Sequence, residues 1–264
     1  MKRSLALLLT LAAAFAVARA EDPKPDDKTP TKKVDATKAP EPSKALPVGT
    51  VLPAGTIKRE KLFPLEEGRT WTYELKVWLA ITAAEGEGTP EESEPPRTHR
   101  LEVSMGESAK IDSKDARCLD YRLDGELTQR AYYFDEGGTV SCPRRILLPG
   151  EHQRDYALTP AQPTLQGDLA VGSKWPWSGK IGSSKATQNF EVLREEKIKV
   201  PARPDEVSAL VIKMTFSGDD ESTGCSVKWY VPDIGLVREE TEVKADQQTY
   251  KTLAVLTKSE SKAH

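Results

Sequence analysis

The segment Trp229–Glu240, WYVPDIGLVREE, decides the fold class of this chain. An aromatic pair ends one apolar stretch, Pro232-Asp233 and Gly235 follow, and Leu236-Val237 begin the next stretch. Proline presets the backbone torsion of a turn, while aspartate and glycine tolerate the left-handed conformations that tight turns need. The segment therefore predicts a β-hairpin.

A second stretch, WTYELKVWLAI at residues 71–81, alternates with the period of a β-strand. The apolar positions of one face are Trp71, Tyr73, Leu75, Val77, Leu79 and Ile81. This pattern predicts a long strand with one fully buried face, and Trp78 adds apolar character to the other face. In the hairpin, Trp229 is expected on the face that carries Val227 and Val231.

Similar stretches recur along most of the chain. Further strands are expected at residues 99–111, 116–123, 127–134, 139–142, 186–200, 207–216, 225–231, 236–244 and 249–257. Asp124-Gly125 and Asp219-Asp220 are turn signals between neighbouring strands. Residues 143–182 are rich in proline and glycine and are expected to form a long connection with short elements. No amphipathic helix of ordinary length is expected, so residues 57–258 predict one mainly β, antiparallel domain.

The first 20 residues predict export. Lys2 and Arg3 precede an apolar run, and Ala18-Arg19-Ala20 fits the small-x-small pattern of signal-peptide cleavage. The alternative, a membrane anchor, is disfavoured because the run is shorter than the roughly 20 residues that span a bilayer. Residues 21–56 hold no aromatic residue and predict a disordered linker, and residues 259–264 a disordered tail. The mature chain is expected in the periplasm or outside the cell.

Charge and cysteine content argue against several classes of function. The net charge of −3 comes from many charges of both signs, which does not predict a nucleic-acid partner. Cys118 and Cys142 are expected on the first and third strands of a meander, roughly 9–10 Å apart and too far for a disulfide. Together with Cys225 they form no metal-ligand pattern, and no cofactor is expected.

Signatures of hydrolytic enzymes are absent from the sequence, which contains no Gly-x-Ser-x-Gly, no His-Glu-x-x-His and no phosphate-binding loop. His152, near Asp155, is a candidate general base, although an exposed loop histidine is the simpler expectation. The carboxylate pairs Glu66-Glu67, Asp219-Asp220 and Glu239-Glu240 are expected to face solvent. The acidic loop 85–96 lacks the ligand spacing of a calcium site.

Aromatic side chains are the best candidates for a functional site. Candidate walls of a cavity for an apolar ligand are Trp71, Tyr73, Trp78, Trp175, Trp177, Trp229 and Tyr230. The alternative is ordinary core packing. Gly68 and Gly172 each precede one of these tryptophans by three residues, which raises the hypothesis of a duplicated sheet.

These motifs together resemble those of secreted bacterial β-proteins that contain Phe-Pro-Leu…Gly-x-x-Trp-x-Tyr, then a Val-Pro-Ala-Gly-Thr-Phe-like segment, then Trp-Tyr-x-Pro-Gly-x-Gly-Leu-Val. The matching residues are 63–73, 200–202 and 229–237. The chain departs from the pattern in two turns, with RPDEV at residues 203–207 and Asp233 in place of glycine. The resemblance implies a strongly curved antiparallel sheet or half-barrel around a hydrophobic cavity, as in periplasmic lipoprotein-carrier (lipoprotein-localisation-factor-like) domains. It implies no catalytic residue.

The sequence thus predicts a non-enzymatic exported envelope protein that binds an apolar ligand, lipid or protein segment in a concave sheet. The alternative is a structural or partner-binding β-sandwich without a ligand cavity. A hydrolase built on His152 and a carboxylate is a remote third hypothesis.

Overall fold

The computed structural model describes residues 59–81, 95–148, 153–245 and 248–261, without the side chains of residues 59, 60, 80 and 81. The expected signal peptide and linker, almost all of the acidic loop, and His152 and His264 lie outside the described residues. Within those residues, no helix is long and apolar enough to cross a membrane.

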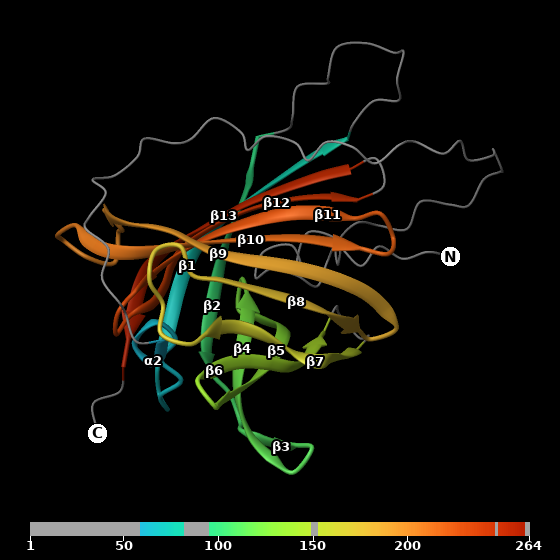
Figure 1. Cartoon of the computed structure of the whole chain (residues 1–264). Helices are drawn as coiled ribbons and strands as arrows, with labels where there is room; N and C mark the ends of the chain where they lie inside the picture. Colours follow the sequence, from blue (N-terminus) through green and yellow to red (C-terminus); the bar gives the residue numbers. More distant parts are fainter. Residues whose placement is uncertain (1–58, 82–94, 149–152, 246–247, 262–264) are drawn as a thin grey trace.

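One antiparallel sheet contains all the strands of the described residues, as Figure 1 shows. The elements in chain order are α2 (Arg59–Leu62), β1 (Thr70–Ile81), β2 (Arg97–Met105), β3 (Ala109–Ile111), β4 (Lys114–Leu123), β5 (Glu126–Glu136), β6 (Thr139–Leu147), β7 (Arg154–Gln166), β8 (Lys174–Ile181), β9 (Ser184–Ile198), β10 (Val207–Gly218), β11 (Thr223–Val231), β12 (Gly235–Ala245) and β13 (Gln248–Glu260).

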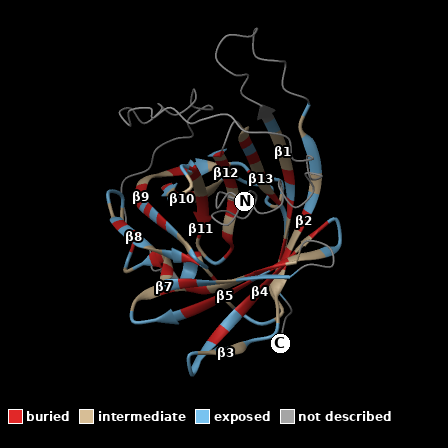
Figure 2. Ribbon diagram, turned by 90° about the vertical axis from the view of Figure 1, so that its right-hand side faces the viewer, coloured by how far each residue is buried: buried red, intermediate tan, exposed pale blue. Residues whose placement is uncertain are grey.

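The sheet closes on itself. Its strand order is β2-β1-β13-β12-β11-β10-β9-β8-β7-β6-β5-β4-β3, and β2 pairs in addition with β4 from Leu101↔Leu123 to Met105↔Leu119. The short β3 pairs only with β4 and stays outside the ring. Figure 2 looks into this barrel. The strongly curved antiparallel sheet is therefore confirmed, and the curvature runs to full closure of one sheet rather than to the two facing sheets of a sandwich.

The prediction for residues 143–182 is wrong, because β6 continues to Leu147 and is followed by the long strands β7 and β8. Pro160 and Pro163 lie within β7, although proline cannot donate to a strand ladder and is excluded from most central strands. The ladder between β7 and β8 contains only Leu158↔Ile181 and Thr159↔Lys180.

Where the backbone ladder between β7 and β8 is interrupted, two indoles of β8 bond to β7 instead. Trp177 Nε1 donates to the Pro160 carbonyl at 3.0 Å, and Trp175 Nε1 donates to the Pro163 carbonyl at 3.4 Å. Gly179 allows the close approach, because a Cβ there would lie 2.6 Å from the Thr159 carbonyl oxygen and 2.7 Å from the Trp177 ring. Side chains thus join the barrel wall where the proline residues interrupt its ladder.

The inner face of β1 is buried only along its first half. Trp71, Tyr73 and Leu75 are at most 5% exposed, whereas Leu79 is 42% exposed. The expectation of a fully buried face is wrong for this end of the strand, because Leu79 lies beyond the packed part of the barrel. Trp78 is half-buried on the opposite face.

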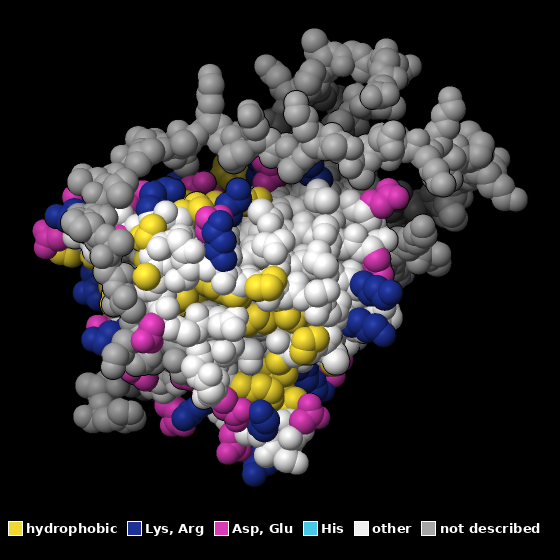
Figure 3. All heavy atoms as spheres, viewed as in Figure 1, with side chains coloured by type: hydrophobic (Ala, Val, Ile, Leu, Met, Phe, Trp, Pro, Cys, Tyr) yellow, Lys and Arg dark blue, Asp and Glu magenta, His cyan; other side chains and the backbone are white. Residues whose placement is uncertain are grey.

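A small second core lies on the outside of β4, β5 and β6. Cys118, Tyr132, Phe134 and Ile146 pack there with residues of β3, whereas Cys142 belongs to the main core. Cys118 lies on β4 and Cys142 on β6, so their expected placement on the first and third strands of a meander is confirmed, and they belong to different cores. On the face shown in Figure 3, cationic and anionic side chains surround hydrophobic ones without a dominant sign.

Candidate functional site

The two sequence motifs at the ends of the domain meet at one end of the barrel. Arg69 Nη1, Trp71 Nε1 and Tyr73 Oη donate to the carbonyls of Asp233, Ile234 and Leu236 at 2.5, 2.6 and 2.9 Å. The donors are alternate residues, with Arg69 directly before β1 and the other two on it, so they lie on one face. The acceptors are two residues of the turn between β11 and β12 and Leu236 at the start of β12. The motifs therefore make one structural unit, a clamp across strands that are not neighbours in the sheet.

The backbone of the turn explains the residues in it. Asp233 has a φ of 62° and Gly235 a φ of 97°, both in the left-handed region. Aspartate tolerates this region better than most residues, so Asp233 fits the turn without a glycine at this position. A Cβ on Gly235 would lie 3.3 Å from the Pro64 ring. The Asp233 amide donates to the Lys61 carbonyl at 2.7 Å, which ties α2 to the turn.

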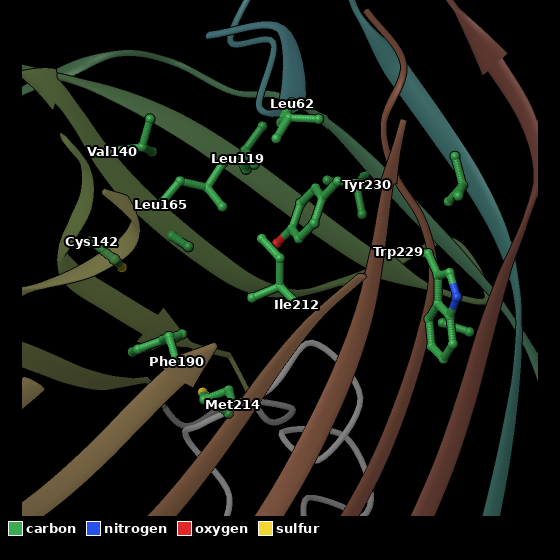
Figure 4. Close-up of a cluster of buried hydrophobic side chains, with 14 of the residues drawn as sticks. Leu62, Leu119, Val140, Cys142, Leu165, Phe190, Ile212, Met214, Trp229 and Tyr230 are labelled. Carbon is green, nitrogen blue, oxygen red and sulfur yellow. The ribbon is translucent and has the colours of Figure 1, made fainter. Parts of the chain in front are cut away.

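An apolar cavity of about 80 Å³ lies inside the barrel behind this clamp. Aromatic and aliphatic side chains make most of its wall, and Arg145, Gln162 and Lys228 add polar groups. The lining residues are Phe63, Pro64, Leu65, Trp71, Tyr73, Val103, Leu119, Tyr121, Tyr133, Arg145, Gln162, Thr164, Phe190, Ile212, Met214, Lys228, Tyr230, Gly235 and Leu236. Figure 4 shows the apolar side chains that converge here, including Leu119, Ile212 and Tyr230.

Three of the seven aromatic candidates line this cavity and four do not. Trp71, Tyr73 and Tyr230 are lining residues. Trp175 and Trp177 are buried at the junction of β7 and β8, where Trp175 stacks on Phe190 with ring centroids 5.2 Å apart. Trp78 is half-buried on the outer face of β1.

Trp229 lies on the opposite face of β11 from Tyr230, because neighbouring residues of a strand alternate. Its Nε1 donates to Glu196 Oε1 at 2.5 Å, and the Arg238 guanidinium lies 5.0 Å from its ring centroid. Both side chains belong to the buried cluster drawn in Figure 4, where the Trp229 ring lies away from the Tyr230 ring. Trp229 and Val231 are buried and Val227 is half-buried. Trp229 therefore anchors the barrel wall from outside.

Phe63-Pro64-Leu65 cover the end of the cavity. The Phe63 ring lies 4.9 Å from the Tyr133 ring, and Leu62 is fully buried next to it. This segment follows directly on α2 and is not part of the sheet. The barrel end is thus filled by a short apolar piece of the same chain.

A polar relay crosses the floor of the cavity. Arg145 Nη2 donates to Gln162 Oε1 at 2.7 Å, and Gln162 Nε2 donates in turn to Gln188 Oε1. Gln162 and Gln188 are 3% and 1% exposed. The relay spans β6, β7 and β9, so it also bridges the weak junction between β7 and β8 from inside. Sequence reasoning missed it, because isolated glutamines in a strand give no signal of an interior position.

The prediction that the Glu239-Glu240 pair faces solvent is wrong for Glu239, which is fully buried. A β-bulge at Val237 shifts the register between Trp229↔Arg238 and Tyr230↔Leu236. A bulge reverses the alternation of inward and outward side chains. Leu236 and Glu239 therefore both point into the barrel, and Arg238 and Glu240 point outward.

Four phenols inside the barrel should control its alkaline stability. Burial raises the pKa of Tyr73, Tyr121, Tyr133 and Tyr230, and the Glu239 charge raises it further for Tyr73 and Tyr230. A pKa raised in the folded state gives stability that is complete below about pH 10 and is lost as pH rises above it, by about 1.4 kcal/mol per pH unit for each group. Absorbance titration of phenolate should show these four ionising only together with unfolding, and Tyr230→Phe should move that step to higher pH. Independent ionisation of all seven tyrosines without unfolding would contradict this.

The hydrolase hypothesis needs His152 and a carboxylate in one cleft. Asp155 is held by Arg144, whose hydrogen bond lowers the pKa of that carboxyl, and His99 Nδ1 lies 2.8 Å from Asp124 Oδ2 at an exposed turn. His152 is outside the described residues. No group of three or more His, Cys, Asp or Glu residues suited to a metal ion occurs in the described part of the chain.

Three solved structures show a weak similarity to this chain. A candidate exported protein with a YmcC-like fold from Bacteroides fragilis is 14% identical, with a TM-score of 0.39, over 75% of this chain and 98% of that chain. A candidate lipoprotein from Parabacteroides distasonis is 17% identical, with a TM-score of 0.40 and the same coverage. The hypothetical lipoprotein YmcC from Escherichia coli is 11% identical, with a TM-score of 0.30, over 75% of this chain and 86% of that chain.

No protein-family model matches the sequence, and no curated protein matches it.

Proposed function

We propose that this chain is a non-enzymatic, exported envelope protein whose barrel holds an apolar ligand or an apolar protein segment in its interior. The observation that carries the proposal is the cavity behind the clamp, together with the apolar segment Phe63-Pro64-Leu65 that covers its end. The predicted signal peptide supports export.

The size of the cavity defines how a ligand would enter. A volume of about 80 Å³ is well below the about 300–1,000 Å³ that ligand pockets usually enclose. The ligand must therefore displace the Phe63-Pro64-Leu65 segment and take over its contacts. Because this segment lies outside the sheet, it can leave while the strand ladder of the barrel stays intact.

Native mass spectrometry of the protein purified from its own host tests this function. The expected result is an added mass that disappears after extraction with organic solvent. Thr164→Leu fills part of the cavity and should reduce the occupied fraction, whereas Thr187→Leu, an exposed position on β9, should leave it unchanged. Equal masses before and after extraction, together with failure to bind any added apolar compound, would argue against the proposal.

A further inference from the structure

A buried polar cluster lies next to the cavity, on β11, β12 and β13. It consists of Ser226, Lys228, Glu239, Thr241 and Thr252, and we call it the Glu239 cluster. Lys228 pairs with Glu239, Ser226 with Thr241, and Thr241 with Thr252 across the three strands, so all five share the inner face. Lys228 also lines the cavity. Lys228 therefore belongs to both the cluster and the cavity wall.

Only one of the two carboxylate oxygens of Glu239 has hydrogen-bond partners. Its Oε1 accepts from Ser226 Oγ at 2.9 Å and from Thr241 Oγ1 at 3.3 Å, and lies 3.5 Å from Lys228 Nζ. Its Oε2 has no hydrogen-bond partner, although Glu239 is fully buried. A buried acceptor left without a donor costs about 1–3 kcal/mol, and more when it is charged.

A second unpartnered atom lies on the same inner face. Thr252 Oγ1 is buried and has no hydrogen-bond partner. Thr252 is 4% exposed and stands opposite Thr241, which itself bonds to Glu239. A group that donates to Glu239 Oε2 and exchanges a hydrogen bond with Thr252 Oγ1 would satisfy both atoms.

We propose that the Glu239 cluster binds the head group of the cavity's ligand, and that this head is a neutral hydrogen-bond donor such as a hydroxyl. The inference rests on the proposed function, because the apolar part of the ligand must occupy the cavity. Charge decides between head groups. Lys228 and Glu239 compensate one another, so a neutral donor preserves the balance. A carboxylate would face Glu239 Oε2, and an ammonium would place a second cation beside Lys228.

The position of Glu239 agrees with this arrangement. Its charge acts on Tyr73 and Tyr230, whose pKa is raised by burial first and by Glu239 next. Both tyrosines line the cavity. Lys228 pairs with Ile212 on one side and with Glu239 on the other, so a ligand with its chain against Ile212 would have its head next to the cluster.

Three probes with the same eight-carbon chain test the inference: 1-octanol, octanoate and octylamine, each titrated calorimetrically against the whole mature chain. The affinity for octanol should exceed that for either charged probe by a factor of about ten or more. This factor corresponds to the free energy of one hydrogen bond to a charged group. In Glu239→Gln, Lys228 loses its counter-charge, and the preference should change to octanoate. Thr252→Val removes one partner and should weaken octanol binding several-fold, while Thr187→Val on the outer surface should not.

The outcomes separate the two proposals. Binding of all three probes with equal affinity would overturn the head-group inference and leave the apolar cavity standing, with the two unpartnered atoms then satisfied by water. A preference of the unmodified protein for octanoate would also overturn the inference, because it places the head elsewhere. Failure of every probe to bind would count against the proposed function itself. If Glu239→Gln does not fold, the Thr252→Val comparison still decides.

Discussion

Replacing Trp71 by alanine is expected to lower the free energy of unfolding by about 3–5 kcal/mol, which is typical of a buried tryptophan. The indole is 5% exposed and donates to the Ile234 carbonyl at 2.6 Å. The substitution would remove this bond, enlarge the cavity and leave the carbonyl without its donor. It would also break the middle bond of the clamp that holds β1 to the turn between β11 and β12.

Two further substitutions separate burial from the hydrogen bond. Trp71→Phe keeps most of the apolar contact but not the donor, and should cost about 1–3 kcal/mol. Trp78→Ala, at a half-buried position of the same strand, should cost less than Trp71→Ala. Denaturant unfolding followed by circular dichroism measures all three. An equal loss for Trp71→Ala and Trp78→Ala would show that the clamp does not contribute to stability.

Replacing Gly224 by alanine is expected to cost about 2–3 kcal/mol, because the added methyl group has no room. A Cβ at this position of β11 would lie 2.2 Å from the Phe216 ring and 2.7 Å from the Glu242 carbonyl oxygen. Phe216 is 5% exposed and pairs directly with Gly224. The glycine therefore lets an aromatic ring of the neighbouring strand approach the backbone closely.

A double-mutant cycle with Phe216→Leu tests this explanation. If the ring causes the clash, Gly224→Ala should cost about 1–2 kcal/mol less in the Phe216→Leu background than in the unmodified protein. The remaining cost would come from the Glu242 carbonyl, which cannot move without breaking the ladder between β11 and β12. Cys225→Ala, on the opposite face of β11, is the control. Strict additivity of the two substitutions would exclude the ring as the cause.

The local strand pattern could be predicted from the sequence, and the closure of the sheet could not. The hairpins at Asp124-Gly125 and Pro232-Asp233 depend on turn residues and short-range alternation, so each is visible within about ten residues. Closure depends on the pairing of β1 with β13 and of β2 with β4, and the first of these joins residues far apart in the chain. The hydrophobic periodicity of a strand does not specify which distant strand it pairs with. The strand β7 could not be predicted for another reason. Its two prolines argue against a strand, and the hydrogen bonds that the indoles of β8 donate to the proline carbonyls are not visible in the sequence.

The candidate site could be predicted from the sequence only in part. Trp71 and Tyr230 could be identified as apolar strand residues, but the bulge at Val237 changes which side chains of β12 point inward. Nothing in the sequence VREETEV marks that bulge, so Glu239 resembled a solvated glutamate. The cavity itself is enclosed by side chains from ten strands and the segment after α2, and its volume depends on how all of them pack.

The most direct test of the account uses the methionine methyl groups as reporters of the cavity. After removal of the predicted signal peptide, the chain retains Met105 and Met214, and only Met214 lines the cavity. In a titration of methyl-¹³C-methionine protein with 1-octanol, the Met214 signal should shift and saturate while the Met105 signal stays in place. An unchanged Met214 signal, or equal and non-saturating shifts of both signals, would contradict an interior apolar binding site.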